Sequence, residues 1–494
     1  MTPLPNIVFD AEEGADLAAA EGTLIVFAGH DGSLSPAAAT IDGAMGGALA
    51  RALGDKSFKG KPGVVETFGW PAGLAAKRVV LACLGDKPDA AAARKTGGAV
   101  AKALAAGPAT LALSGAGDDD IVAGVVMAVA LRLYDFREYK KSDEDTPSAP
   151  RTLRALAANP EALARGSRDM MALAEGVYFT RDLVNEPANR LTTDEFAARL
   201  AAMQEIGLEV EIMGEDDLKR LGMGALLGVG QGSPSETKVV TMRWNGGAAG
   251  EAPFAFVGKG VVFDTGGISL KPAAGMEDMT MDMGGAGTVA GVMRTLALRK
   301  AKANVIGVVG LVENMPDGLA QRPGDIVKSM KGDTIEVINT DAEGRLLLAD
   351  VLWHVQEAEK PTAIVDLATL TGAVIIALGH HRAGFYATND ELATQLTTAC
   401  EATGDDAWRL PLGKPYRDQL KSAKADIKNT GGRPAGSVTA AEFLRAFVKD
   451  DMPWVHIDIA GTATTNSGTD LAPKGATGWG VAALDALVRA RLES

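Results

Sequence analysis

Apolar runs alternate with amphipathic stretches through the first 140 residues. The runs at 23–28, 78–84 and 109–114 have the length and composition of buried strands. Helical spacing of apolar residues predicts helices over 97–106 and 121–139. Alternating strands and helices indicate an α/β domain. This domain contains no phosphate-binding glycine motif, so we predict no catalytic or nucleotide-binding role for it.

A polar, acidic segment with two prolines interrupts this pattern at residues 142–150. Such a composition is typical of a linker. It places the boundary between a smaller N-terminal domain, residues 1–150, and a larger C-terminal domain, residues 151–494. A helix predicted over 161–184 opens the second domain, and Pro187 limits it because proline disfavours helical backbone at the preceding residue.

The second domain repeats the alternation on a larger scale. Strand-like runs occupy residues 238–244, 254–263, 304–313, 334–338, 363–367 and 454–459. Helices are predicted over residues 193–206, 284–300, 346–357, 440–448 and 482–491. We therefore expect an α/β protein of two domains, the larger of which has a mixed, doubly wound central sheet flanked by helices.

Length, charge and cysteine content narrow the function classes. The chain has 494 residues, more than the roughly 250 to 300 at which a single core stops growing. Its net charge of −14 disfavours nucleic acid and anionic membranes as partners. We find no apolar run of about 18 residues that could span a bilayer and no signal-peptide pattern in residues 1–10. Cys83 and Cys400 have no metal or redox spacing, so we expect a cytoplasmic protein.

One stretch concentrates charged groups at a strand-to-helix junction. Residues 339–346 follow the apolar run at 334–338 and precede a helical pattern. Thr340 and Glu343 have the spacing of a capping box, which alone would account for both residues. A capping box explains neither Asp341 nor Arg345. Two carboxylates two residues apart repel each other unless a cation lies between them, so a metal site is the second interpretation.

Further charged residues lie at other element junctions. Asp264 precedes a pair of glycines and Asp282 precedes a Gly/Ala-rich helix, and each could simply cap a turn or a helix. Lys259 interrupts an apolar strand, which is costly unless it is paired, neutral or at an exposed edge. Lys271 alone has the pattern of a surface lysine. None of the five histidines has metal-ligand spacing, so a shared site would use oxygen ligands and favour Mn²⁺ or Mg²⁺, with Zn²⁺ as an alternative.

Together these motifs resemble the leucyl aminopeptidase family, the cytosol-type two-metal peptidases. The likeness covers the whole C-terminal domain, whereas the N-terminal domain matches in its general α/β pattern and in the helix end at 139–140. The matching segments are 185–189, 257–260, 263–267, 270–272, 282, 339–346, 369–372, 436–437 and 456–461.

The resemblance implies two adjacent divalent metal ions per subunit, Mn²⁺ foremost and Zn²⁺ or Mg²⁺ as alternatives. By this likeness the metal ligands are Lys259, Asp264, Asp282, Asp341 and Glu343. Lys271 and Arg345 would be the catalytic pair, and Arg345 would hold a bicarbonate as base at a helix start. An apolar pocket for the first side chain would be lined by Met279, Thr369 and Gly372. The family also implies a homohexamer, to whose assembly the N-terminal domain would contribute.

The expected reaction is release of N-terminal residues from peptide substrates, with Leu and other apolar residues preferred. A two-metal site polarises a carbonyl and converts a bridging water to hydroxide near neutral pH, and Lys271 would stabilise the oxyanion. A two-metal phosphoesterase would normally add histidine ligands and a basic surface. The remaining alternative is a non-catalytic or dual-role oligomeric scaffold that binds DNA. The acidic balance weighs against DNA, and the complete set of seven residues weighs against lost catalysis.

Overall fold

The chain divides into two α/β units. The computed structural model describes residues 1–54, 58, 60–141 and 151–493, and the expected linker at 142–150 lies outside these described residues. One unit comprises Met1–Ala174 and Asn466–Lys474, and the other comprises Glu175–Thr465 and Gly475–Ser494. The division falls within the long helix α5 (Pro160–Asn185), further along the chain than residue 150.

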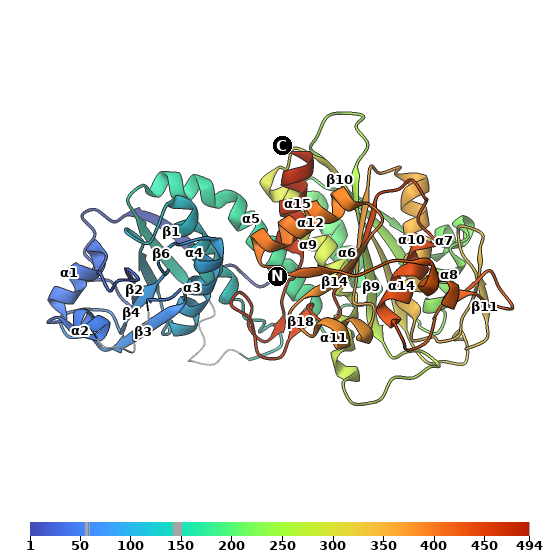
Figure 1. The fold of residues 1–494 in the computed structure, drawn as a ribbon, viewed down its shortest axis with the longest axis horizontal. Helices are drawn as coiled ribbons and strands as arrows, with labels where there is room; N and C mark the ends of the chain where they lie inside the picture. The colour runs from blue at the N-terminus through green and yellow to red at the C-terminus, as the bar shows by residue number, and fades with distance from the viewer. Residues whose placement is uncertain (55–57, 59, 142–150, 494) are drawn as a thin grey trace. The chain divides into compact units, whose positions relative to one another are not determined.

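The first unit is built on a six-stranded sheet of order β1-β6-β5-β2-β4-β3 (Figure 1). Its neighbouring strands are parallel except for the antiparallel pair of β3 and β4. The strands are β1 (Asn6–Ala11), β2 (Thr23–Ala28), β3 (Val64–Gly69), β4 (Arg78–Cys83), β5 (Ala109–Ala112) and β6 (Thr152–Ala157). The helices are α1 (Pro36–Ala44), α2 (Ala48–Gly54), α3 (Ala90–Ala103) and α4 (Asp119–Arg132).

Side chains of β2 alternate between two cores because successive residues of a strand point to opposite faces. Ile25 and Phe27 join one hydrophobic cluster, whereas Leu24 and Val26 join the other. The helix expected over 121–139 is wrong at its end, since α4 stops at Arg132 and the polar residues from Asp135 onward do not continue it. The helix expected over 97–106 begins earlier, where the side chain of Asp89 accepts the Ala92 N–H as an N-cap.

The second unit is built on an eight-stranded mixed sheet of order β15-β14-β17-β13-β9-β10-β8-β7. Its centre, β17-β13-β9-β10, is parallel, and antiparallel pairs flank it at β14–β17, β10–β8 and β8–β7. The strands are β7 (Glu209–Met213), β8 (Lys238–Asn245), β9 (Phe254–Asp264), β10 (Asn304–Asn314), β13 (Ile364–Ala368), β14 (Ala383–Ala387), β15 (Ala407–Arg409) and β17 (Trp454–Asp458). The mixed central sheet expected from the sequence is confirmed.

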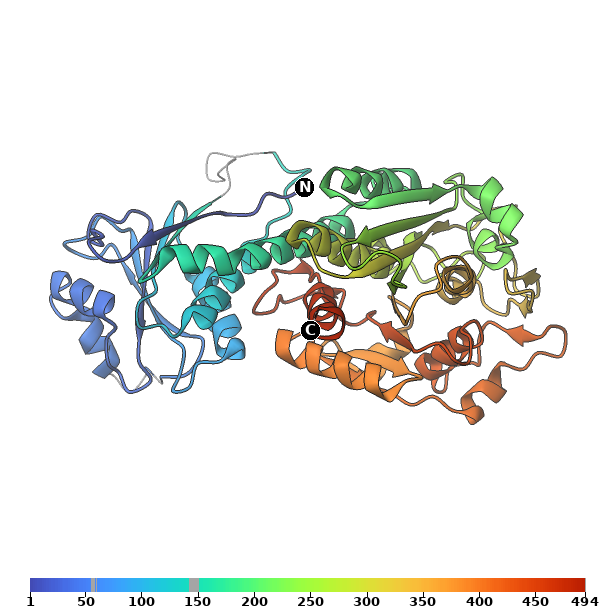
Figure 2. The ribbon, with the colours of Figure 1, turned by 90° about the horizontal axis from the view of Figure 1, so that it is seen from above.

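Helices cover both faces of this sheet. Phe254 and Phe256 of β9 enter one hydrophobic cluster with α9, α12 and α15, while Ala255 and Val257 enter another with α8, α10 and α14 (Figures 1 and 2). The helices are α6 (Thr193–Ala201), α7 (Glu215–Leu221), α8 (Gly224–Gly230), α9 (Gly284–Arg299), α10 (Glu343–Ala358), α11 (Gly372–Leu378), α12 (Asp390–Thr403), α13 (Lys414–Arg417), α14 (Gly436–Arg445) and α15 (Val481–Leu492). The 3₁₀ helices are η1 (Ala202–Ile206), η2 (Met276–Met283) and η3 (Asp418–Leu420).

The strand expected over 334–338 does not belong to the central sheet. It is β12 (Thr334–Glu336), which pairs with β11 (Ile326–Lys328) and β16 (Ile427–Lys428) in a separate three-stranded sheet. A further ribbon joins β18 (Thr464–Thr465) to β19 (Gly475–Ala476). Among the described residues, no helix combines the length and the apolar character needed to cross a membrane.

Candidate active site

The candidate site lies where β9 ends and α10 begins. Asp264 is the last residue of β9, and pairing with β10 shifts register between Val312 and Glu313, just before this end. Such an irregularity re-aims side chains at a strand end. The chain then turns through Gly266, whose φ of +86° suits glycine, and a Cβ there would lie 2.9 Å from an Asp341 carboxylate oxygen. The turn therefore brings Asp264 next to the start of α10.

Thr340 ties the two ligand-bearing turns together. Its buried hydroxyl donates to the Gly266 carbonyl at 2.6 Å and accepts the Ser269 N–H at 2.8 Å. The expected capping box is therefore wrong, since α10 begins at Glu343 and the residue that precedes it, Ala342, offers no side-chain cap. The Thr340 hydroxyl bonds to the neighbouring turn and does not cap the helix, so the Glu343 side chain can face the site.

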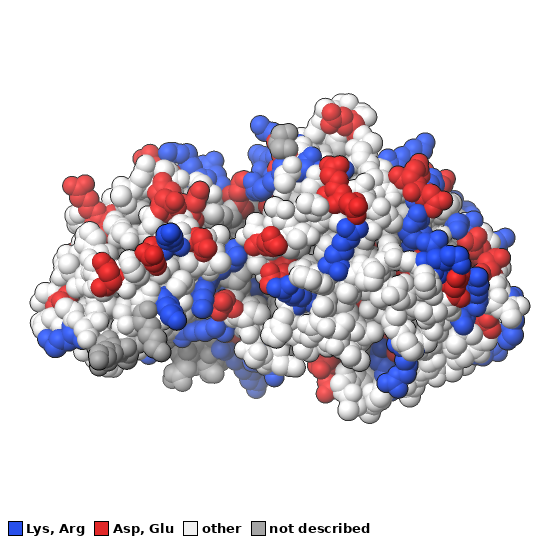
Figure 3. Space-filling view, viewed as in Figure 1, with Lys and Arg blue, Asp and Glu red and all other residues white. Residues whose placement is uncertain are grey.

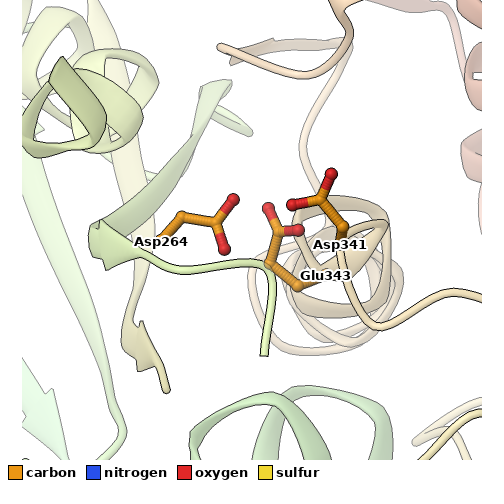
Figure 4. A group of neighbouring side chains, drawn as sticks. All are labelled: Asp264, Asp341 and Glu343. Atoms are coloured by element: carbon orange, nitrogen blue, oxygen red, sulfur yellow. The ribbon is translucent and has the colours of Figure 1, made fainter. Parts of the chain in front are cut away.

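Three carboxylates converge at this junction. Oxygen atoms of Asp264, Asp341 and Glu343 all lie within 4.8 Å of one another, and the side chains point toward a common centre (Figure 4). Asp264 and Glu343 are almost fully buried. Asp264 also accepts the Gly266 N–H at 2.8 Å, so its expected role in the turn coexists with its place in the cluster.

Lys259 and Asp282 extend the cluster to one side. Lys259 is buried in β9, a central strand, so the alternative of an exposed edge is wrong. Its Nζ lies 2.7 Å from Asp282 and 2.8 Å from Glu343. It reaches them because α10 has glycine at position 344, where a Cβ would lie 2.7 Å from the lysine chain. Burial lowers the pKa of Lys259, but attraction to Asp282, Glu343 and Asp264 outweighs it and raises the pKa above its usual value.

Lys271 closes the other side of the cluster and is not a surface lysine. Its Nζ lies 2.7 Å from Asp264 and also contacts Asp341. Burial lowers the pKa of Lys271, but attraction to Asp264, Glu343 and Asp341 outweighs this effect and raises it. The structure therefore places two cations on opposite flanks of four carboxylates.

The arrangement fits divalent metal ions. Four carboxylates face two lysines, and burial raises the pKa of both Asp282 and Glu343, to which repulsion from Asp264 adds. One oxygen of Asp282 and one of Glu343 are buried and have no hydrogen-bond partner among the described residues. Buried carboxylate oxygens are normally paired or bound to metal. The carboxylate oxygens, together with the Lys259 nitrogen once metal binding has displaced its proton, are ligands that Mn²⁺, Mg²⁺ and Zn²⁺ accept.

Arg345 lies one helical step beyond the cluster. It is almost fully buried and its NH1 group donates to the Asn429 carbonyl at 2.8 Å, while its Nε has no partner among the described residues. Burial lowers the pKa of Arg345 to about 10, against attraction to Glu343, Asp458 and Asp341. A buried cation with an unused donor near a helix start is suited to an anion.

The three residues expected to line a pocket lie on two segments. Thr369 is buried and its hydroxyl donates to Asp282 at 2.8 Å. Gly372 is exposed at the start of α11, and Met279 is half-buried in η2. Thr369 thus reaches the ligand cluster directly, while the pocket itself stays a prediction.

Several residues that organise the site carry no motif of their own. Asn314 ends β10, and its amide nitrogen donates to Asp264 at 2.7 Å and to the Thr340 carbonyl at 3.2 Å. Asn429 follows β16 and accepts the N–H groups of Ile338 and Asn339. Both act on residues far along the chain, so local spacing gave no signal. The available sign was that each is a polar residue at the end of a strand.

Comparison with known proteins covers both units. Residues 178–485 match the cytosol aminopeptidase family, catalytic domain, and residues 25–143 match its N-terminal domain. The chain is 56% identical over 495 residues to the "Probable cytosol aminopeptidase" of Cereibacter sphaeroides, with 99% of each chain covered. The protein of the same name from Caulobacter vibrioides is 50% identical over 479 residues, covering 95% of this chain and 97% of the relative.

Solved structures agree with the sequence comparison. The bottromycin maturation enzyme BotP in complex with Mn superposes with a TM-score of 0.83 at 32% identity, covering 96% of this chain and 99% of BotP. A mutant of tomato leucine aminopeptidase gives a TM-score of 0.84 at 29% identity, covering 99% of this chain and 97% of the tomato chain.

Proposed function

The chain belongs to the cytosol aminopeptidase family and is a metal-dependent aminopeptidase, and from this premise we propose how it acts and on what. It releases the first residue of peptides, with Leu and other apolar residues preferred. One observation carries the proposal: buried carboxylates from three separate segments meet, with unpaired oxygens, between two lysines. Burying several charged groups with unpaired oxygens lowers the stability of a protein unless they bind a ligand such as a metal ion.

The metal ligands are Lys259, Asp264, Asp282, Asp341 and Glu343. Asp264 and Glu343 lie at the centre of the group, where each could serve two ions, with Asp341 on one flank and Lys259 and Asp282 on the other. Two bound divalent ions polarise the scissile carbonyl and supply an acidified water as nucleophile. Mn²⁺ is the favoured metal, in keeping with its presence in the BotP structure.

Lys271 stabilises the negative charge that develops on the carbonyl oxygen. Its ammonium group is held by Asp264 and Asp341 at the edge of the cluster. The neighbouring carboxylates raise the pKa of Lys271, which favours its charged form. A positive group fixed beforehand where negative charge forms lowers the barrier without reorganisation during the reaction. Lys271 therefore acts as an electrostatic stabiliser and not as a base.

Arg345 would hold an anion that accepts the proton of the attacking water and passes it to the amine nitrogen, which leaves as the peptide C–N bond breaks. Arginine cannot serve as the base itself, and its buried Nε is available as a donor. Bicarbonate matches this requirement because it is a small planar anion with a free oxygen after a guanidinium has bound it. Arg345 supplies the charge and orientation, and its guanidinium is almost fully buried.

The proposal extends to the substrate pocket, the location and the assembly of the protein. Met279, Thr369 and Gly372 line the pocket for the first side chain. The protein is cytoplasmic and forms a homohexamer to which the N-terminal unit contributes. On the face shown in Figure 3, acidic and basic groups are interspersed, and the net charge is −14. Neither feature favours the DNA-binding scaffold.

Hydrolysis of Leu-p-nitroanilide after loading with Mn²⁺ tests the proposal. The wild type should be active, a chelated sample inactive until Mn²⁺ is restored, and Asp341→Ala inactive under all conditions. Thr295→Val is a matched folding control, because it removes a buried hydroxyl that bonds within α9, remote from the cluster. An inactive loaded wild type, or an Asp341→Ala variant as active as wild type, would refute the assignment.

A further inference from the structure

A second buried carboxylate system lies beside the site without belonging to the ligand cluster. Asp458, the last residue of β17, is fully buried. One of its oxygens accepts the N–H groups of Leu370 at 3.1 Å, Thr371 at 3.4 Å and Ala460 at 3.2 Å. The other accepts the Thr371 hydroxyl at 2.6 Å. One carboxylate therefore fixes the whole turn that follows β13.

This turn in turn holds two of the candidate ligands. The Thr369 carbonyl accepts the Lys259 Nζ at 2.8 Å, and the Thr369 hydroxyl donates to Asp282 Oδ1 at 2.8 Å. Lys259 occupies the same Asp282 oxygen at 2.7 Å. Both contacts therefore use Oδ1, and Asp282 Oδ2 is left buried without a partner among the described residues. The turn selects which oxygen of Asp282 is available.

A purely structural role does not account for this placement. Asp350 is also a fully buried carboxylate that accepts backbone N–H groups, from Leu226 at 2.9 Å and Met330 at 2.8 Å. Neither of those two bonds reaches a residue of the cluster. The bonds of Asp458 reach Leu370, the residue after Thr369, whose side chain contacts Asp282. The negative charge of Asp458 also attracts Arg345.

We propose that Asp458 is a positioning residue for the aminopeptidase reaction. It sets the 369–371 turn so that Thr369 holds Lys259 and orients Asp282, and so determines how the Lys259–Asp282 side of the centre binds its metal. Among the described residues, the hydrogen bonds of Thr369 join it to Lys259 and Asp282 and not to Asp264 or Asp341. The proposal rests on the two-metal function given above.

Isothermal titration of the metal-free protein with Mn²⁺ tests this role without using catalysis. The wild type should bind two ions. Asp458→Asn keeps the shape of the side chain but loses its charge and one acceptor, and should weaken one of the two binding steps by about ten- to a hundred-fold, the usual effect of residues that orient metal ligands. The other step should change by less than about threefold on the same grounds. Asp350→Asn should leave both steps unchanged.

Substitutions at Thr371 provide a milder version of the same test. Thr371→Val removes the hydroxyl that donates to Asp458 and accepts the Val374 N–H at the start of α11, whereas Thr371→Ser keeps both bonds. We expect Thr371→Val to weaken the same single Mn²⁺ step and Thr371→Ser to restore it. If Asp458→Asn fails to fold, this pair decides the question.

Two outcomes would overturn the positioning role. One is wild-type binding of both ions by Asp458→Asn and Thr371→Val, and the other is equal weakening of both steps, which general loosening would cause. Failure of the proposed function appears differently: the wild type itself would bind no pair of Mn²⁺ ions or would not cleave Leu-p-nitroanilide when loaded.

Discussion

Replacing Thr340 with valine should separate the two turns that carry the metal ligands. The substitution keeps the shape of the side chain but removes a buried hydroxyl that bonds the Gly266 carbonyl and the Ser269 N–H. Leaving the buried carbonyl without a partner costs about 1 to 3 kcal/mol. Ser269 is half-buried and its N–H can find water, so its loss adds about 1 kcal/mol. We expect Thr340→Val to lower the free energy of unfolding by about 2 to 4 kcal/mol.

The same variant should affect the metal centre beyond its effect on stability. Thr340 lies directly before Asp341, so loss of its anchor lets Asp341 and Glu343 move relative to Asp264. Metal affinity should fall by about ten- to a hundred-fold, measured by Mn²⁺ titration below the unfolding temperature of the variant. The control Thr295→Val should lose little stability and keep its affinity. Wild-type affinity in Thr340→Val, or an equal loss in the control, would refute the reasoning.

Three further predictions concern the lysine, the metal and the surrounding fold. Gly344→Ala places a Cβ 2.7 Å from the Lys259 side chain. Hydrolysis of Leu-p-nitroanilide should therefore fall at least about tenfold, even though alanine is more favourable in a helix than glycine by about 1 kcal/mol. Unchanged kinetics would contradict the close packing of Gly344 against Lys259. Mn²⁺ at a hundred times its Kd should stabilise the protein by about 2.7 kcal/mol per site, seen as a higher unfolding temperature that chelation reverses and Asp264→Asn abolishes. Burial raises the pKa of Asp350 to about 7, so the native protein keeps a proton there that the unfolded chain, with a pKa near 3.9, has lost. The Asp350 contribution to stability should therefore fall as the pH rises from about 4 to about 7, and urea midpoints below and above this window should differ less in Asp350→Asn than in wild type.

The sequence indicated the candidate metal ligands because each one lies where a hydrophobic pattern breaks. Lys259 interrupts an apolar strand, Asp264 ends it beside glycines, and Asp341 and Glu343 precede a strongly periodic helix. The structure brings these residues together, with Lys271 and Asp282 beside them. The central strands and long helices could also be predicted from the sequence, because their apolar periodicity extends over several helical turns or a whole strand.

Features that depend on distant contacts could not be predicted. Thr340 has the local spacing of a helix cap, yet a hydrogen bond to Gly266, 74 residues away in sequence, uses its hydroxyl. The strand before it joins a small separate sheet because its partners come from β11 and β16, which are too short to give a pattern. Asp458 likewise acts through a turn 87 residues away in sequence. In each case a tertiary partner far along the chain, and not the local pattern, determined the structure.

The most direct test of the two-metal centre is anomalous X-ray diffraction from crystals of the wild-type protein soaked in Mn²⁺. The account predicts two manganese peaks in each subunit, both in contact with Asp264 and Glu343, one of them also with Asp341 and the other with Lys259 and Asp282. No peak in this cluster at saturating Mn²⁺, or manganese bound only elsewhere, would contradict it.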